Sequence, residues 1–463
     1  MHTPISTQCF KAYDIRGQVP SDLNEDVAYR IGRAMVTELQ GKSIVLGRDM
    51  RLESPMLAEA MIRGLCDAGA NVIDIGLCGT EEVYFATSAL SADGGVMITA
   101  SHNPKGYNGM KLVKSESCPI SGDTGLNAIR ERVENGDLGP LASSPGEIRF
   151  ELSKVSYIKH LLSYVDVTKL KPLKILADPG NGAAGPVLKE LTNKLPFEWV
   201  IINEEPDGNF PNGVPNPLLP ENRELTREAL LANHCDLGLA WDGDFDRCFF
   251  FDANGRFIEG YYIVGLLAEM LLKLYPGSKI IHDPRLTWNT IAQVKLAGGI
   301  PIQSKTGHAF IKERMRAEDA IYGGEMSAHH YFRDFAYCDS GMIPWLLLTA
   351  LMSTSGKSLS DLVDARINDF PCSGEINYHV ESVHDALSEV LKHFSHNALD
   401  VDTTDGISLD FGAWRFNLRG SNTEPLLRLN VETKGDMELL KIKIKEVEEV
   451  LFALEQRNRP DAI

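Results

Sequence analysis

Three blocks of this 463-residue chain repeat one order of elements: a short strand rich in Val and Ile, a polar turn, and a helix. The strand runs into the turn in "VLGRDMR" (45–51), "ILADPGN" (175–181) and "IIHDPRL" (280–286). Strands that alternate with helices in this way are typical of α/β layers. The same order of elements in three successive blocks indicates a threefold internal repeat of α/β type.

After about residue 370 the pattern changes. The segments "GEINYHV" (374–380), "GISLDFGAWRFNLRG" (406–420) and "LLRLNVE" (426–432) read as strands, and the chain closes with an amphipathic helix over 436–456. In "LLRLNVE" the apolar side chains fall on one face and the polar ones on the other, which predicts a half-buried strand whose polar face is free to meet a ligand. We expect a smaller α+β domain here.

Charge and composition limit the partners. The formal net charge of −18 disfavours nucleic acid and anionic lipid, so an anionic substrate would need a local basic pocket. The eight cysteines are scattered without a CxxC pair, and the N-terminus lacks a secretory signal, which favours a cytoplasmic location. The most apolar run, 342–352, falls well short of the roughly 20 residues that span a bilayer, and predicts a buried helix. We expect no membrane and no obligate protein partner.

"GNGAAG" (180–185) fits the dinucleotide-binding pattern GxGxxG, with Glu204 and Glu205 following at the appropriate distance. However, Asp178 and Pro179 precede the first glycine, and the unit lies mid-chain without the strand succession of a nucleotide-binding domain. We favour a tight strand-to-helix turn that needs glycine for steric reasons over a NAD site.

"WDGDFDR" (241–247) presents Asp242, Asp244 and Asp246 directly after an apolar strand. Three carboxylates so close repel one another unless a cation lies among them, and hard oxygen ligands suit Mg²⁺. In an extended strand they would be spread along one face, so the segment must curl into a loop. Arg247 at the sixth position and Ala253 at the twelfth exclude an EF-hand. The alternative is a solvated acidic turn.

"TASHNPKGYNG" (99–109) places Ser101 after the apolar run "GGVMI". A serine can accept a phosphoryl group where a metal and cations offset the transferred charge. Lys111 supplies positive charge, and His102 or a more distant histidine could manage the proton. The alternative is a turn or helix-capping serine.

"GGEMSAHHYF" (323–332) offers a carboxylate, a hydroxyl and an imidazole on Glu325, Ser327 and His329, groups suited to holding sugar hydroxyls. "KTGHAF" (305–310) adds Lys305 and His308. A metal site or a structural turn is the alternative for the first of these segments.

"RGSNTEP" (419–425) reads as an anion cradle. Arg419 can bind phosphate with two hydrogen bonds, Gly420 permits close approach of the backbone, and small donors follow at Ser421, Asn422 and Thr423. It lacks the GK[ST] of a P-loop, and a polar β-turn is the alternative.

The four motifs "TASHNP", "DGDFDR", "GEMSAHH" and "RGSNTEP", in this order over essentially the whole chain, resemble the α-D-phosphohexomutase family, with the closest likeness to its bacterial phosphomannomutase/phosphoglucomutase members. The resemblance implies three similar α/β domains with mixed sheets and a smaller fourth domain around a central cleft. We expect them at 1–153 with the phosphoserine loop, 154–256 with the metal loop, 257–369 with the sugar loop, and 370–463 with the phosphate loop.

The resemblance also implies roles. Ser101 would be carried as phosphoserine and hold Mg²⁺ together with Asp242, Asp244 and Asp246. The residues implied near the reacting phosphate or around the cleft are Tyr13, Arg16, Lys111, Arg247 and Arg285. Those implied in sugar binding and acid–base work are Lys305, Gly307, His308, Glu325, Ser327 and His329, and those implied for the phosphate that is not reacting are Arg419, Ser421, Asn422 and Thr423.

The implied reaction is the interconversion of mannose 1-phosphate and mannose 6-phosphate through a hexose 1,6-bisphosphate, which would also act as activator. Met326 favours mannose, with glucose phosphates also accepted, and Ala328 departs from the commoner "GEMSGH" form. Two other functions remain open at this point: a metal-dependent sugar-phosphate phosphohydrolase, and a non-catalytic sugar-phosphate-binding protein.

Overall fold

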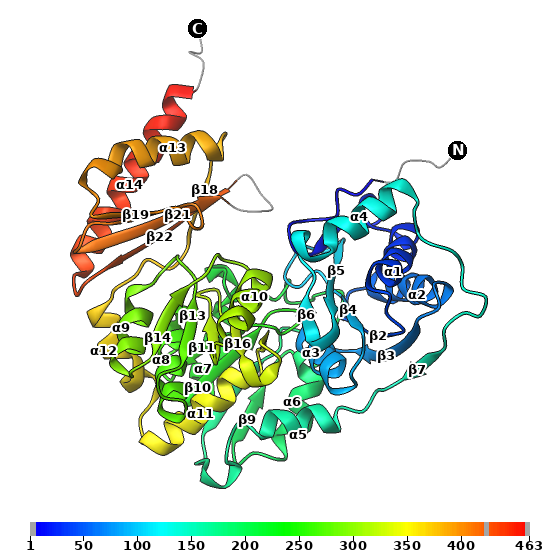
Figure 1. Cartoon of the computed structure of the whole chain (residues 1–463). Coiled ribbons are helices and arrows are strands. Elements are labelled where there is room, and N and C mark those ends of the chain that lie inside the picture. The colour runs from blue at the N-terminus through cyan, green and yellow to red at the C-terminus, as the bar shows by residue number, and fades with distance from the viewer. Residues whose placement is uncertain (1–5, 421–425, 459–463) are drawn as a thin grey trace. The chain divides into compact units, whose positions relative to one another are not determined.

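The computed structural model describes residues 6–420 and 426–458 (Figure 1). The chain forms two compact units. The first unit contains residues 1–258 and 329–358, and the second contains residues 259–328 and 359–463.

The first sheet of the first unit is mixed. Its strands are β1 (Ile15–Gln18), β2 (Ser43–Arg48), β3 (Asn71–Leu77), β4 (Gly94–Ile98), β5 (Tyr107–Lys114), β6 (Cys118–Pro119) and β7 (Ile148–Phe150). The order is β1-β5-β4-β2-β3-β7, with β2, β3, β4 and β7 parallel and β5 antiparallel to β4. The helices around it are α1 (Glu25–Leu39), α2 (Ser54–Asp67), α3 (Thr80–Ala89) and α4 (Leu126–Asn135). Side chains of α1, α2 and α4 share one apolar core with the sheet, and α3 packs in a separate core with other side chains of the same strands.

The second sheet, also in the first unit, follows the same plan. Its strands are β8 (Lys174–Asp178), β9 (Glu198–Ile201), β10 (Leu237–Trp241), β11 (Cys248–Asp252) and β12 (Phe257–Ile258), in the order β12-β11-β10-β8-β9. The helices of this region are α5 (Val155–Leu162), α6 (Ala184–Thr192) and α7 (Glu224–Ala232). The hairpin β16 (His330–Phe332) and β17 (Cys338–Asp339) and helix α11 (Ile343–Ser355) complete the unit.

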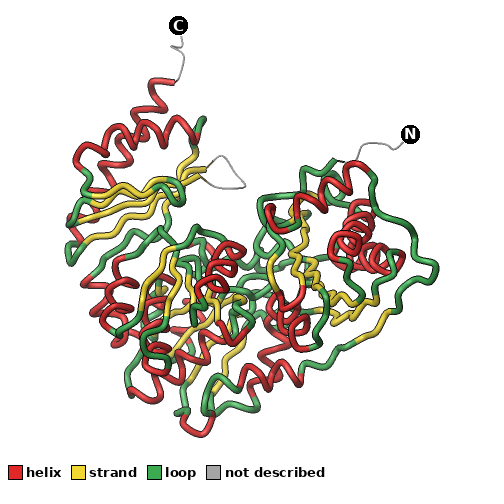
Figure 2. Tube along the Cα trace, in the orientation of Figure 1, coloured by secondary structure: helices red, strands yellow, loops and turns green. Residues whose placement is uncertain are grey.

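The second unit begins with three parallel strands, β13 (Lys279–His282), β14 (Ile300–Gln303) and β15 (Tyr322–Gly324). Its helices in this region are α8 (Gly260–Leu274), α9 (Trp288–Leu296), α10 (His308–Glu318) and α12 (Leu359–Asp369). The C-terminal sheet is wholly antiparallel, in the order β18-β22-β21-β20-β19. Its strands are β18 (Ile376–His379), β19 (Asp400–Asp402), β20 (Ile407–Asp410), β21 (Trp414–Gly420) and β22 (Leu426–Thr433), and α13 (Val383–Phe394) and α14 (Met437–Asn458) pack on one face (Figures 1 and 2). The predicted fold class is confirmed: three α/β regions with mixed sheets and a smaller C-terminal domain.

The threefold repeat is visible in the order of the parallel strands. In each region the third strand lies beside the first and the second lies on the other side, as β4-β2-β3, β10-β8-β9 and β15-β13-β14. Each first strand leads to an aspartate, at 49, 178 or 283, whose Oδ1 accepts the backbone N–H two residues on at 2.9 Å. This turn at the carboxyl end of the first strand is the polar turn of the sequence repeat. The loops that carry Ser101, Asp242 and Glu325 follow the third strands β4, β10 and β15, so these candidate residues lie at the same point of every repeat.

The glycines of "GNGAAG" are needed sterically. Gly180 has φ +61°, and a Cβ at this position would lie 2.5 Å from Pro215 Cβ. A Cβ on Gly185 would lie 1.8 Å from the carbonyl oxygen of Glu204. Side chains at these positions would clash, which supports the interpretation as a tight turn between β8 and α6.

The expectation of a free polar face on β22 was wrong. Asn430 and Glu432 are both 0% exposed. Glu432 accepts hydrogen bonds at 2.7 Å from Arg415 Nη1 and from the backbone N–H of Thr287, and Asn430 donates to the carbonyl of Gly374 at 2.8 Å. The strand is therefore buried on both faces over this stretch, because polar side chains satisfied by neighbouring segments can occupy a core.

The apolar run at 342–352 forms most of α11, which is buried over most of its length, as predicted. Among the described residues no helix combines the length and apolarity that crossing a bilayer requires. All eight cysteines are free thiols.

Candidate active site

Ser101 lies in the loop between β4 and β5 and is 1% exposed. Its φ is +51°, a left-handed conformation that is uncommon for residues other than glycine and is found where surrounding contacts hold the backbone. The Ser101 N–H donates to Thr99 Oγ1 at 2.9 Å. Its hydroxyl donates to Asp242 Oδ2 at 2.8 Å and lies 3.0 Å from His102 Nδ1. The serine oxygen is thus aimed at the acidic loop.

Two residues that the sequence reasoning did not single out hold this loop. The buried Arg51 guanidinium donates to the carbonyl oxygens of Ser101 (2.9 Å) and Asn103 (2.6 Å). Asp49 accepts the Thr99 hydroxyl at 2.7 Å. Both belong to the polar turn "VLGRDMR", so the repeat of this turn in the sequence was the available signal.

The acidic loop between β10 and β11 curls as expected. Phe245 has φ +44°, and one oxygen from each of Asp242, Asp244 and Asp246 lies within 4.8 Å of the others. All three carboxylates are buried. Asp244 Oδ1 is buried and has no hydrogen-bond partner among the described residues. Hard divalent cations are bound by carboxylate oxygens. Three buried carboxylates, one of them with an oxygen that accepts no hydrogen bond, therefore fit a metal ion.

Lys111 reaches this cluster from β5. Its Nζ donates to Asp244 Oδ2 at 2.7 Å and to Asp246 Oδ2 at 2.5 Å. Burial alone would lower the pKa of Lys111, but the two carboxylates outweigh burial and raise it. Burial and the negative charges of Asp246 and Asp244 raise the pKa of Asp242 to about 7. Arg247 is a second cation beside the cluster, since its Nε lies 3.5 Å from Asp242 Oδ2 and 3.8 Å from Asp246 Oδ1.

Further predicted residues surround the cluster in the first unit. His329 Nε2 lies 3.1 Å from Arg247 Nε and 3.5 Å from Asp246 Oδ1. Arg16 lies on β1, where it pairs in register with Gly109 of β5, and its guanidinium donates to Asp14 (2.7 Å) and Asn103 (2.5 Å).

Two more predicted residues belong to this unit. Tyr13, on the segment that leads into β1, is half-buried. His102 is next to Ser101, and burial, followed by the positive charges of Arg247 and Arg16, lowers the pKa of this imidazole well below its ordinary value. The lowered pKa keeps His102 neutral at pH 7 and makes it a weaker base than an ordinary imidazole.

In the second unit, the structure brings Arg285 together with Glu325 and Ser327. Arg285 Nη2 lies 2.6 Å from Asp283 Oδ2, 3.1 Å from Ser327 Oγ and 3.4 Å from Glu325 Oε1. The backbone N–H of Gly307 donates to the same Glu325 oxygen at 3.1 Å. Four predicted residues thus form one polar cluster.

The other predicted residues of this region lie around that cluster. Lys305 is exposed, with its ammonium over the ring of Phe310 at 5.3 Å, and His308 begins α10. His329 belongs to the first unit, so the boundary between the units falls inside the "GEMSAHH" motif.

Arg419, at the end of β21, is held by a residue that the sequence reasoning missed. Its Nη2 donates to Glu375 Oε2 at 3.3 Å, and Glu375 also lies 3.6 Å from Arg285 and from Arg428. Burial would raise the pKa of Glu375, but Arg428, Arg419 and Arg285 outweigh it and lower the pKa. The predicted residues Ser421, Asn422 and Thr423 lie outside the described residues.

Four family models match consecutive parts of the chain. They are the α/β/α domains I, II and III of phosphoglucomutase/phosphomannomutase, at residues 7–139, 155–255 and 259–370, and the C-terminal domain, at 375–449. The chain belongs to this family.

Full-length relatives agree with the models. A protein of Xanthomonas campestris named "Phosphohexose mutases" is 60% identical over 442 residues, which cover 96% of this chain and 98% of that one. A phosphomannomutase of Escherichia coli K12 is 57% identical over 443 residues, with 94% and 97% covered. The crystal structure of a phosphoglucomutase/phosphomannomutase family protein from Burkholderia thailandensis is 32% identical and superposes with a TM-score of 0.86 over 97% of this chain and 98% of that one.

An N-acetylphosphoglucosamine mutase of Aspergillus fumigatus, solved in complex with GlcNAc-6P and magnesium, shares the fold of this phosphohexomutase with a TM-score of 0.62. It is 14% identical, and the match covers 95% of each chain. At this identity the likeness concerns the fold alone.

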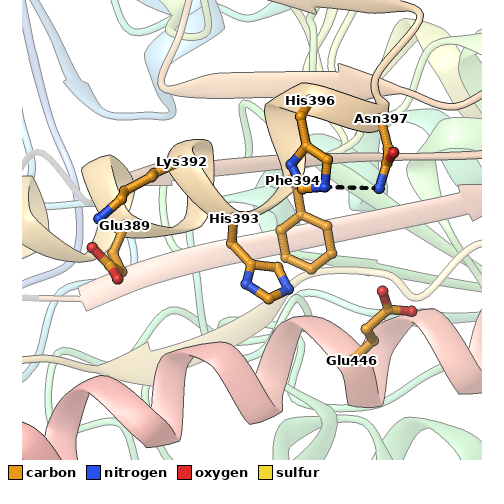
Figure 3. A pocket seen from close by; sticks show the side chains of 7 residues that line it. All are labelled: Glu389, Lys392, His393, Phe394, His396, Asn397 and Glu446. Carbon is orange, nitrogen blue, oxygen red and sulfur yellow. Dashed lines mark hydrogen bonds between the residues drawn. The ribbon is translucent and has the colours of Figure 1, made fainter.

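A groove of about 420 Å³ lies on the helical side of the C-terminal domain (Figure 3). It is lined by Glu389, Lys392, His393, Phe394, His396, Asn397 and Glu446. His396 and Asn397 are hydrogen-bonded to each other at 3.1 Å, and most of the lining residues are exposed. No residue predicted from the motifs lines this groove.

Proposed function

We propose that this phosphohexomutase interconverts mannose 1-phosphate and mannose 6-phosphate, and also accepts glucose phosphates, with the phosphoryl group carried on Ser101. Full-length relatives named as phosphomannomutases or phosphohexose mutases, which are 55–60% identical to this chain, support the proposal. The observation that carries the proposal is the 2.8 Å hydrogen bond from Ser101 Oγ to Asp242, at the edge of an acid cluster that also binds Lys111.

We further propose that Asp242, Asp244, Asp246 and the phosphate on Ser101 hold Mg²⁺. The free Oδ1 of Asp244 and the surplus of carboxylates support this assignment. Magnesium, when bound, would withdraw negative charge from the phosphoryl group during transfer.

In the proposed half-reaction, a free hydroxyl of the hexose monophosphate attacks the phosphorus on Ser101. The bond from phosphorus to Ser101 Oγ breaks as the new oxygen–phosphorus bond forms, and the product is a hexose 1,6-bisphosphate. An imidazole, either His329 or His102, would take the hydroxyl proton, and Ser101 Oγ would take up a proton as it leaves phosphorus, so that the serine ends as a hydroxyl and no net proton is released. Lys111 would compensate charge on the phosphoryl oxygens. After the sugar turns around, the reverse step returns the other phosphoryl group to Ser101. Added hexose 1,6-bisphosphate would activate the enzyme, because it restores phosphate to Ser101.

Recognition of the sugar and of its other phosphate would fall to the second unit. We assign sugar hydroxyls to Glu325 and Ser327, whose side chains converge on Arg285, with Lys305, Gly307 and His308 around them. The phosphate that is not reacting is assigned to Arg419, Ser421, Asn422 and Thr423. Met326 supports a preference for mannose. A cytoplasmic location, and the lack of nucleic-acid, membrane and protein partners, remain predictions.

The test incubates purified protein with mannose 1-phosphate, Mg²⁺ and a trace of hexose 1,6-bisphosphate. We expect mannose 6-phosphate without release of inorganic phosphate, and an additional mass of about 80 Da on the peptide that contains Ser101. Free phosphate without mannose 6-phosphate would instead support the phosphohydrolase. Ser101→Ala should bind substrate normally but lose turnover, whereas a non-catalytic binding protein would be unaffected in its role.

A further inference from the structure

The N-terminus of α3 contacts the acidic loop (241–247) through Gly79 and Thr80. A Cβ on Gly79 would lie 2.1 Å from the ring of Phe245, so only glycine allows this approach. The next residue, Thr80, is 0% exposed and donates its backbone N–H to the carbonyl of Asp244 at 3.0 Å. Its hydroxyl donates to Asp244 Oδ2 at 2.5 Å. Thr80 therefore hydrogen-bonds both the backbone and the side chain of Asp244.

This contact makes the two oxygens of Asp244 different. Oδ2 accepts hydrogen bonds from Thr80 Oγ1 and from Lys111 Nζ. Oδ1 is buried and accepts none from the described residues. Rotation of the Asp244 carboxylate would break the hydrogen bonds to Oδ2. Oδ1 is therefore the oxygen that remains available to a ligand.

We propose that Thr80 is a positioning residue for the cation of this site and that it favours Mg²⁺ over Ca²⁺. The inference deepens the proposed function and rests on it for the presence of a metal. Mg²⁺ requires near-octahedral geometry and usually takes one oxygen from a carboxylate, whereas Ca²⁺ accepts 6–8 ligands and often takes both oxygens. Thr80 and Lys111 together engage Oδ2 and leave Oδ1 of Asp244 as the oxygen available to the cation, which suits Mg²⁺.

The hydroxyl can be removed with little change of shape. Thr80→Val keeps the backbone hydrogen bond to Asp244 and loses the two bonds of the hydroxyl, to Asp244 Oδ2 and from Lys111 Nζ at 3.4 Å. Lys111 is then the remaining donor to Oδ2 among the described residues, so the carboxylate is held less firmly. Thr80→Ser restores the hydroxyl. Thr87→Val is a matched control, because Thr87 is also 0% exposed on α3 but donates its hydroxyl to the carbonyl of Val83 at 2.7 Å, within the helix.

The experiment is titration calorimetry of each protein with Mg²⁺ and, separately, Ca²⁺, with the extent of Ser101 phosphorylation matched by mass spectrometry. We expect Thr80→Val to weaken Mg²⁺ binding by about 10-fold or more, as removal of partners of metal ligands commonly does, and to change the Ca²⁺ Kd by less than about 3-fold. Thr80→Ser and Thr87→Val should bind both ions as the unchanged protein does.

Equal Mg²⁺ affinity in folded Thr80→Val and in the unchanged protein would overturn the role of Thr80 and leave the mutase proposal intact. Absence of Mg²⁺ binding in the unchanged protein would overturn the metal assignment and this inference together. If Thr80→Val does not fold, Thr80→Ala provides the same comparison, with the same outcomes.

Discussion

The two units hold charge clusters of opposite construction. In the first unit, Lys111 and Arg247 lie beside the three buried carboxylates of Asp242, Asp244 and Asp246. Asp244 Oδ1 has no donor among the described residues. In the second unit, three arginines surround Glu375, and Arg285 is held in addition by Asp283. The three acids of the first unit outnumber Lys111 and Arg247 beside them. The arginines of the second unit already have an anion among them, Glu375.

The difference indicates what each cluster can receive. A buried group of carboxylates without full compensation takes up a proton or binds a further cation. Arginines paired with carboxylates are held in place without a ligand, and an incoming phosphate would compete with Glu375 for their charge. The first cluster therefore suits a metal that remains bound, and the second suits an anion that exchanges.

The largest effect is expected from breaking the acid cluster. Asp244→Asn removes a charge and a hard oxygen ligand, and should lower kcat by about 1,000-fold or more, as should excess EDTA. Activity after EDTA should return with Mg²⁺. Asp236→Asn, at an exposed acid just before β10, is the control and should remain active. Full activity in excess EDTA would contradict the metal assignment.

The next effect concerns the arginines. Arg419→Ala should raise KM by about 10- to 100-fold and change kcat by less than about 3-fold, because a site that binds phosphate equally in ground and transition states contributes to KM alone. Arg419→Lys should lie between, since lysine keeps the charge but loses the paired hydrogen bonds. Steady-state kinetics measures both KM and kcat. An unchanged KM in Arg419→Ala would show that Arg419 does not bind the substrate phosphate.

A smaller effect is expected at Glu375. Glu375→Gln removes the internal anion while keeping most of the shape, so inhibition by inorganic phosphate should become about 3- to 10-fold stronger as the arginines lose their compensating charge. Glu381→Gln, at an exposed position of the same segment, should leave the inhibition constant unchanged. Weaker inhibition in Glu375→Gln would show that this carboxylate serves to orient the arginines rather than to compete with phosphate.

The smallest effect concerns stability. Glu81 on α3 accepts hydrogen bonds from Ser340 Oγ (2.9 Å) and from the backbone N–H of Met342 (3.2 Å), and burial raises its pKa from 4.5 to about 8. The folded state thus retains a proton that the unfolded state releases at lower pH, so the free energy of unfolding falls as pH rises from about 4.5 to about 8. Urea unfolding between pH 5.5 and 8.5 should show this slope, and Glu81→Gln should show a flatter profile. Parallel profiles would contradict the assignment.

Local pattern predicted the strands and the fold class and indicated the candidate loops, because hydrophobic runs and polar turns are local properties of the chain. The curl of the acidic loop followed from electrostatics alone. Thr80 and Glu375 could not be found in this way, since their partners lie about 160 and about 40 residues away in the chain. Arg51 had one local signal, the repeated polar turn to which it belongs. The buried polar face of β22 was mispredicted for the same reason: Glu432 is satisfied by Thr287, which no periodicity reveals.

The most direct measurement uses mannose 1-phosphate labelled in its phosphate with ³²P, mixed with the phosphorylated enzyme and quenched during turnover. We predict that label appears on the Ser101 peptide as fast as mannose 6-phosphate forms, and that Ser101→Ala acquires none. Formation of product at the full rate with no label on the protein would contradict the account.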